Sequence, residues 1–113
     1  MNTTPPPPTP SPAAPDWRSA EVDALCDALL LLETRDDAAA FLRDVCSLHE
    51  LEVLAHRWQA ARLLDQGIPY ARVAAQVRGS TATVTRVAHW LRHGEGGYRL
   101  VLDRLARASR GRR

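Results

Sequence analysis

The chain has 113 residues, the length of one small domain, and 45% of them are hydrophobic while only 5% are aromatic. A core built mainly from Leu, Val and Ala favours helices. Its two cysteines, Cys26 and Cys46, are too few for a disulfide framework. Both stand on apolar stripes, and we expect them to be reduced, buried residues of a cytoplasmic protein.

Residues 1–15, "MNTTPPPPTPSPAAP", cannot build a core and favour extended polyproline conformations. We predict a disordered Pro-rich arm. It has neither the charged start nor the apolar centre of a secretory signal. The run "LCDALLLLE" is too short to span a bilayer, so we expect no membrane association.

A helical domain is predicted over residues 16–108. Val22, Leu25, Cys26, Leu29 and Leu32 recur at helical steps, with Asp16 or Ser19 as the cap. After a break at 34–37, a short second helix carries Ala40, Phe41 and Val45. Ser47 and Glu50 form a capping-box signature that opens a long third helix, which Gly67 and Pro69 end.

Two short helices are expected next, over about 70–77 and 80–92. The segment "HGEGG" breaks the chain, and a last helix over about 97–108 carries Tyr98, Val101, Leu102 and Leu105. Residues 109–113 read as a disordered basic tail. No strand alternation of useful length is present, so the predicted fold is all-α with six helices.

Charge divides the chain unevenly. Residues 16–52 hold ten acidic residues and three Arg, whereas residues 67–92 hold four Arg and no acid. Six Arg and two acids follow from residue 93 onward. An acidic front and a basic back are expected when one face meets a polyanion, although a solvated basic surface has the same pattern.

The segment at about 70–92, "YARVAAQVRGSTATVTRVAHWLR", has the layout of a helix-turn-helix. Its inner stripe is apolar, and the other face of the second helix is rich in small residues and threonines. Such a helix can enter the major groove, with its first turn at the base edges and Arg side chains on phosphates. The candidate DNA-binding residues are Arg72, Ser80, Thr81, Ala82, Thr83, Thr85, His89 and Arg92. At the turn, Arg78 stands where helix-turn-helix units usually have Gly, so either the turn is shifted by one residue or Arg78 adopts an unfavourable conformation.

Residues 20–105, and above all "ATVTR", the upstream "HR" and the stop at Gly67, resemble the Trp repressor superfamily, particularly its YerC/YecD-type branch. The resemblance implies an intertwined homodimer that presents its helix-turn-helix twice. It also implies that Thr81 and Ala82 lie at bases, and that Arg72, Thr83, Thr85 and His89 lie near phosphates. Two such helices would read a near-palindrome with half-sites about one helical turn apart.

The resemblance also suggests a ligand pocket. Arg57 and Arg86 match the two arginines that sandwich tryptophan in the family's namesake, and Ser47 matches a pocket threonine. Val87 and Trp90, however, replace small residues that the pocket needs. We therefore expect Trp90 or Val87 to block or replace the free amino acid, which leaves another small-molecule effector open and makes tryptophan doubtful. The alternative role for Arg57 is an ordinary ion pair with Glu52, Asp65 or a partner chain.

Other chemistry has little support. The pairs Cys46/His49 and His89/His93 have metal-ligand spacings but fall on different helices, so we expect no metal site and no cofactor. No catalytic motif is present, and we expect no enzyme. The prediction is a dimeric, sequence-specific DNA-binding regulator of bacterial transcription, a repressor by occlusion, located with the nucleoid. The alternative is a helical protein-interaction module with a vestigial helix-turn-helix; single-stranded RNA binding ranks last because aromatic residues are few.

Overall fold

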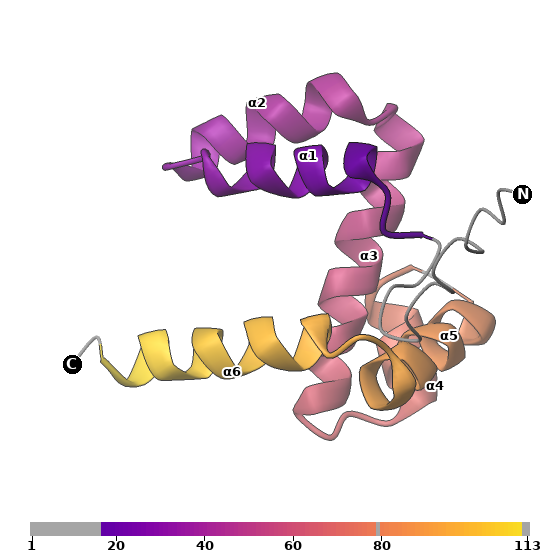
Figure 1. Ribbon diagram of the computed structural model, residues 1–113. Helices are drawn as coiled ribbons and strands as arrows, with labels where there is room; N and C mark the ends of the chain where they lie inside the picture. Colours follow the sequence, from indigo (N-terminus) through magenta and orange to yellow (C-terminus); the bar gives the residue numbers. More distant parts are fainter. Residues whose placement is uncertain (1–16, 79, 112–113) are drawn as a thin grey trace, which may run out of the picture. The chain divides into compact units, whose positions relative to one another are not determined.

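The computed structural model describes residues 17–78 and 80–111, and these form six α-helices and no strand. The all-α, six-helix prediction is confirmed. The helices are α1 (Ala20–Leu30), α2 (Arg35–Val45), α3 (Leu48–Asp65), α4 (Tyr70–Gln76), α5 (Thr81–His93) and α6 (Gly97–Arg110) (Figure 1). The last helix continues past the predicted end at 108, so Ser109 and Arg110 are helical. The Pro-rich arm lies outside the described residues.

The chain divides into two compact units, Met1–Leu42 and Arg43–Arg113. In the first, α1 and most of α2 run antiparallel (Figure 1). Ser19 caps α1 by accepting a hydrogen bond from the Val22 amide at 3.1 Å, as predicted. Thr34 caps α2 in the same way, through the Asp37 amide at 3.0 Å. The break between the helices is therefore slightly earlier than predicted. No described helix is long and apolar enough to cross a membrane.

The apolar stripe of α1 is open in the single chain. Neither α1 nor α2 has a buried residue. Leu25 and Leu29 of the predicted inner stripe are 44% and 43% exposed, and Leu30 and Leu31 are 83% and 79% exposed. The expectation that Cys26 is buried is wrong for this chain, where it is exposed. An apolar stripe determines which face of a helix packs against a neighbour, but within its own unit α1 has too few neighbouring elements to bury that face.

The ends of α3 follow the sequence signals closely. Ser47 and Glu50 form the predicted capping box, with the Ser47 amide donating to Glu50 Oε1 at 2.8 Å and the Glu50 amide donating to Ser47 Oγ at 3.1 Å. These bonds, the backbone one first, hold the pKa of Glu50 below its ordinary value. At the other end, Gly67 has φ +82°, and the Gly67 and Ile68 amides donate to the Leu64 and Leu63 carbonyls. This is a Schellman ending, and it turns the chain sharply into α4.

The core of the second unit lies where α3, α4 and α5 meet. Small side chains on α3 let the two shorter helices approach closely, and β-branched residues fill the remaining space. Val73, Val84 and Val87 are the largest fully buried side chains. The core consists of Ala60, Ala61, Leu63, Val73, Ala74, Val77, Val84 and Val87. It holds α4 and α5 in a fixed orientation on the end of α3.

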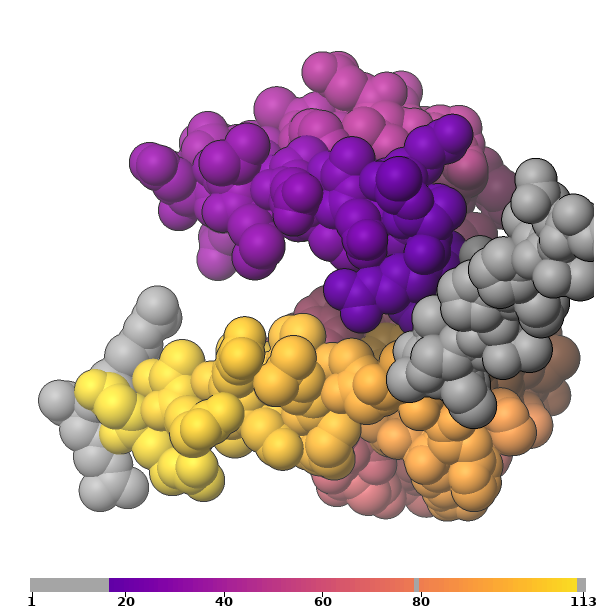
Figure 2. Space-filling view, in the orientation of Figure 1, coloured from indigo at the N-terminus to yellow at the C-terminus, as the bar shows by residue number. Residues whose placement is uncertain are grey.

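Helix α6 packs on α3 and α5 by its first half only. Arg99 donates to Asp65 of α3 at 2.8 Å and to Asp103 at 2.9 Å, and these two contacts raise its pKa. Leu102 is buried, but Leu100, Val101 and Leu105 are 43–48% exposed. The C-terminal half projects from α3 as the yellow arm of the space-filling view (Figure 2). The predicted inner face of this helix is thus only partly covered.

Candidate nucleic-acid interface

Helices α4 and α5 form the predicted helix-turn-helix, joined by a turn over 77–80 (Figure 1). Val73 and Ala74 of α4 are buried, as are Val84, Val87 and Ala88 of α5. These residues belong to the inner stripe expected from the sequence. Because that stripe is buried, the opposite side of α5 is the one that faces outward.

One described residue between α4 and α5 has a strained backbone. Arg78 has φ +54°, in the left-handed region. The structure therefore selects the second of the two expectations for this turn: Arg78 adopts the conformation usually given to glycine. Its side chain is exposed.

The first turn of α5 is held by its own hydroxyl groups. Ser80 is the N-cap, and its Oγ accepts from the Thr83 amide at 3.2 Å. The hydroxyl oxygen atoms of Ser80 and Thr83 lie 3.3 Å apart. Thr85 Oγ1 donates to the Thr81 carbonyl at 2.8 Å, so the Thr85 proton is already used within the helix. Ser80 and Thr85 thus have structural roles, and Thr81 and Ala82 are the most open residues of this turn.

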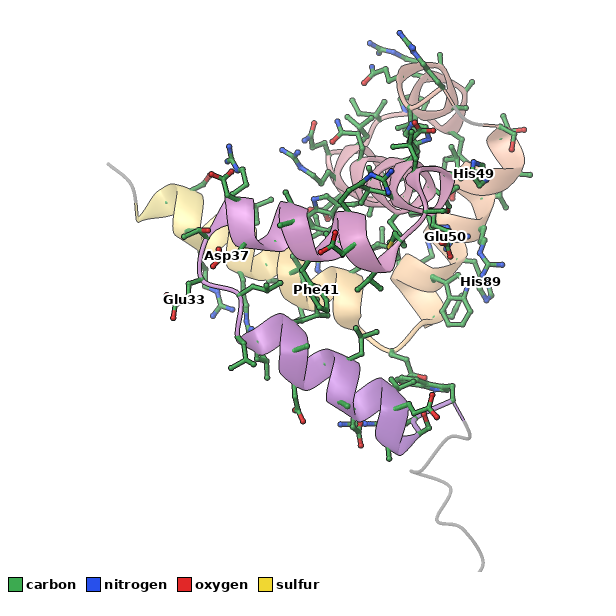
Figure 3. All side chains as sticks on the ribbon, turned by 90° about the horizontal axis from the view of Figure 1, so that it is seen from above. Glu33, Asp37, Phe41, His49, Glu50 and His89 are labelled. Carbon is green, nitrogen blue, oxygen red and sulfur yellow. The ribbon has the colours of Figure 1, made fainter. Side chains whose placement is uncertain are left out.

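The outer face of α5 is polar, exposed and free of acid. Thr81, Ala82, Thr85, His89 and Arg92 are all exposed, Thr83 is half buried, and Arg72 is exposed on α4. His89 lies on this face (Figure 3), with its ring centroid 5.1 Å from that of His93 and 6.1 Å from that of Trp90. The predicted candidates on α4 and α5 are therefore all exposed or half buried.

Arg92 also lines a cavity of about 410 Å³ in the second unit. Its walls come from the end of α3, the turn after it, and the C-terminal half of α5. Tyr70 and Leu91 give it an apolar side, and Asp65 a polar one. The sequence did not predict this cavity, because two segments about 20 residues apart, 64–70 and 88–92, come together to form it.

Four of the five residues proposed for a ligand pocket lie together. Arg57 from α3 and Arg86, Val87 and Trp90 from α5 line a cavity of about 170 Å³. Tyr98 of α6 completes the lining and was missed, because no local pattern indicates that α6 crosses here. Ser47 does not line this cavity; it is occupied as the cap of α3. Within the described residues, none of the ion pairs considered for Arg57 forms.

Trp90 is confined by the residue that ends its helix. A Cβ built on Gly94 would clash with the Trp90 carbonyl oxygen and lie 2.9 Å from Cε3 of the Trp90 ring. Only glycine, which has no Cβ, leaves the space beside residue 94 free for the Trp90 indole ring. The ring remains 45% exposed. Glycine at 94 therefore fits an indole that lies back over the end of α5, at the edge of the Arg57–Arg86 cavity.

In the described residues, no group of three or more His, Cys, Asp or Glu side chains is arranged so that it could hold a metal ion. Cys46, His49 and Glu50 do share a shallow cavity of about 270 Å³ on α3, which Val53, Leu54 and Arg57 complete. The Glu50 carboxylate accepts the hydrogen bond from the Ser47 amide, and the Glu50 amide donates to Ser47 Oγ; Figure 3 labels Glu50 and His49. Arg57 thus lines two cavities.

Comparison with known proteins agrees with this geometry. Residues 20–106 match the family described as Trp repressor protein. A Bacillus subtilis (strain 168) protein, the uncharacterized protein YerC, is 34% identical over 88 residues, which cover 78% of this chain and 85% of that protein.

Two solved structures share the fold. One is a candidate Trp repressor from Staphylococcus aureus, with 38% identity and a TM-score of 0.75 over 80% of this chain and 90% of that one. The other is a TrpR-like protein from Eubacterium eligens ATCC 27750, with 34% identity and a TM-score of 0.76 over 80% and 93%.

Proposed function

The chain belongs to the Trp repressor family, and on that premise we propose that it is a sequence-specific DNA-binding regulator that represses transcription by occupying its operator. The outer face of α5 is the observation that carries this proposal. It presents Thr81 and Ala82 at an open first turn, Arg92 near its end and no acid between them. Small side chains let the helix backbone approach base edges, and a carboxylate there would be repelled by phosphates.

We propose that a homodimer presents this face twice. Support comes from the open apolar surfaces of α1 and α6, whose leucines are 43% exposed or more at positions 25, 29, 30, 31, 100 and 105. A two-fold dimer would cover such surfaces and would read a near-palindromic site with half-sites about one helical turn apart.

We further propose that tryptophan is not the effector. The Arg57–Arg86 cavity, at about 170 Å³, is smaller than the roughly 300–1,000 Å³ of small-molecule pockets. Trp90 stands at its edge with an indole of its own. Isothermal titration with L-tryptophan should give no saturable heat, and saturable heat in the micromolar range would contradict this part of the proposal.

A salt titration tests duplex binding. The protein should bind a random-sequence duplex at low salt, with an affinity that falls linearly with salt on logarithmic axes. Arg72→Gln and Arg92→Gln should each reduce the slope by about 1.8, because each removes one phosphate contact from both subunits of the proposed homodimer. Absence of duplex binding at low salt would support the interaction-module alternative instead.

Selection from a pool of random duplexes tests sequence specificity. A regulator of this kind should enrich a near-palindrome, whereas a protein that only neutralises phosphates would enrich none. Single-base changes in the enriched half-site should each weaken binding by about 1–3 kcal/mol.

A further inference from the structure

The helix-turn-helix turn contains a strained residue that glycine could replace. Arg78, with φ +54°, is the only non-glycine residue of the described chain with positive φ; the other two such positions there are Gly67 and Gly96. A left-handed backbone crowds the Cβ of an L-residue against the carbonyl oxygen, and glycine avoids this. At position 78, by contrast, this left-handed conformation is adopted by an arginine, which has a long cationic side chain.

The fold does not use that side chain. Arg78 is exposed, and among the described residues it has no side-chain hydrogen bond or ion pair. Two other arginines form ion pairs: Arg18 pairs with Asp23, and Arg99 pairs with Asp65 and Asp103. Because the strained Arg78 makes no side-chain contact within the fold, we expect its side chain to act in binding something outside the fold.

The position of Arg78 suggests what that role is. It lies two residues before the Ser80 cap and three before Thr81, the open residue at the start of α5. The sequence from 67 to 92 has no acid that could pair with it. We propose that Arg78 contacts a DNA phosphate beside the first turn of α5, and so fixes where that helix starts in the groove. This inference rests on the proposed DNA-binding function and adds a contact to it.

Two substitutions at the same backbone position isolate the charge. Arg78→Gln and Arg78→Lys both keep a long side chain in the left-handed conformation, but only the second keeps a cation. Arg78→Gln should weaken duplex binding about threefold to tenfold at moderate salt and reduce the salt slope by about 1.8, because one contact is lost from each subunit of the proposed homodimer. Arg78→Lys should retain the slope. Arg104→Gln, which removes an exposed arginine on α6, is the matched control and should leave the slope unchanged.

A third variant, Arg78→Gly, moves stability and binding in opposite directions. It should raise the Tm by about 2 °C or more, because the strain is relieved, while it weakens DNA binding as Arg78→Gln does. An unchanged salt slope in Arg78→Gln, with a wild-type protein that binds duplex, would overturn the inference and leave the proposed function intact. A wild-type protein without duplex binding would overturn both.

Discussion

Gly94 controls where the Trp90 ring can lie, and this makes one residue at the end of α5 important for the shape of the neighbouring cavity. Trp90 lines that cavity with Arg57 and Arg86. A side chain on Gly94 would meet both the Trp90 ring and the Trp90 carbonyl, and the carbonyl cannot move without disturbing the end of α5.

Gly94→Ala should therefore destabilise the protein by about 1–3 kcal/mol, the usual cost of forcing a methyl group into occupied space. Gly97→Ala is the matched control, because a Cβ at Gly97 meets nothing within 4 Å and alanine favours the helix that begins there. Denaturant unfolding measures both. Equal stability of the two variants would show that the indole does not lie over Gly94.

Among single residues of the helix-turn-helix, the sequence predicts caps and backbone strain better than it predicts side-chain hydrogen bonds. The sequence predicted the Ser80 cap, and it gave a strained Arg78 as one of two alternatives for the turn, because both follow from the chemistry of a few neighbouring positions. The engagement of the Thr85 hydroxyl with the Thr81 carbonyl was not predicted. A threonine on a helix can donate to its own backbone or to a ligand, and the sequence does not distinguish the two.

At the scale of helices, the ends of α3 were predicted well because caps are local. The Ser47–Glu50 box and the Gly67 turn each need only a few residues to form. Burial was predicted less well. The stripe of α1 was correctly identified as apolar, yet Leu25 and Cys26 are exposed in the chain. A sequence pattern predicts which face of a helix is apolar, but it does not predict which element buries that face.

The capping box predicts how α3 responds to acid. The folded protein holds the pKa of Glu50 below 4.5, so its carboxylate stabilises the fold above about pH 4.5, and this contribution is lost as pH falls through the lowered pKa. Glu50→Gln keeps an oxygen acceptor that does not titrate. Its Tm should fall less than that of wild type between pH 5.5 and about pH 3.

Circular dichroism melts over this range measure the difference, at fixed protein concentration. Glu52→Gln, which removes a carboxylate from the same helix outside the capping box, is the control. Identical acid dependence in Glu50→Gln and wild type would mean that the Glu50 carboxylate makes no special contribution to the cap.

At the scale of the whole molecule, both compact units have exposed apolar side chains. Leu31 at the end of α1 is 79% exposed, and Leu105 on the outer half of α6 is 43% exposed. We propose that a dimer covers both residues, and the family resemblance implies such a dimer. Composition alone could not predict a dimer, since a near-neutral chain rich in leucine is compatible with monomers and dimers alike.

The dimer should depend on these leucines. Leu31→Arg and Leu105→Arg each place a charge on a surface that we propose is buried between subunits, and either change should shift the protein toward monomer in sedimentation velocity. Arg104→Gln on the same helix as Leu105 serves as the control. A wild-type protein that sediments as a monomer at micromolar concentration would contradict the proposed assembly.

The most direct test of the account concerns position 81. Thr81→Asp and Thr81→Asn differ only in charge, and an acid in the first turn of a helix favours the helix, so both variants should fold at least as well as wild type. We predict that Thr81→Asp weakens binding to the selected duplex at least about 30-fold, because its carboxylate meets phosphates, and that Thr81→Asn weakens it far less. Equal affinity of the two folded variants for that duplex would show that the first turn of α5 does not lie against DNA.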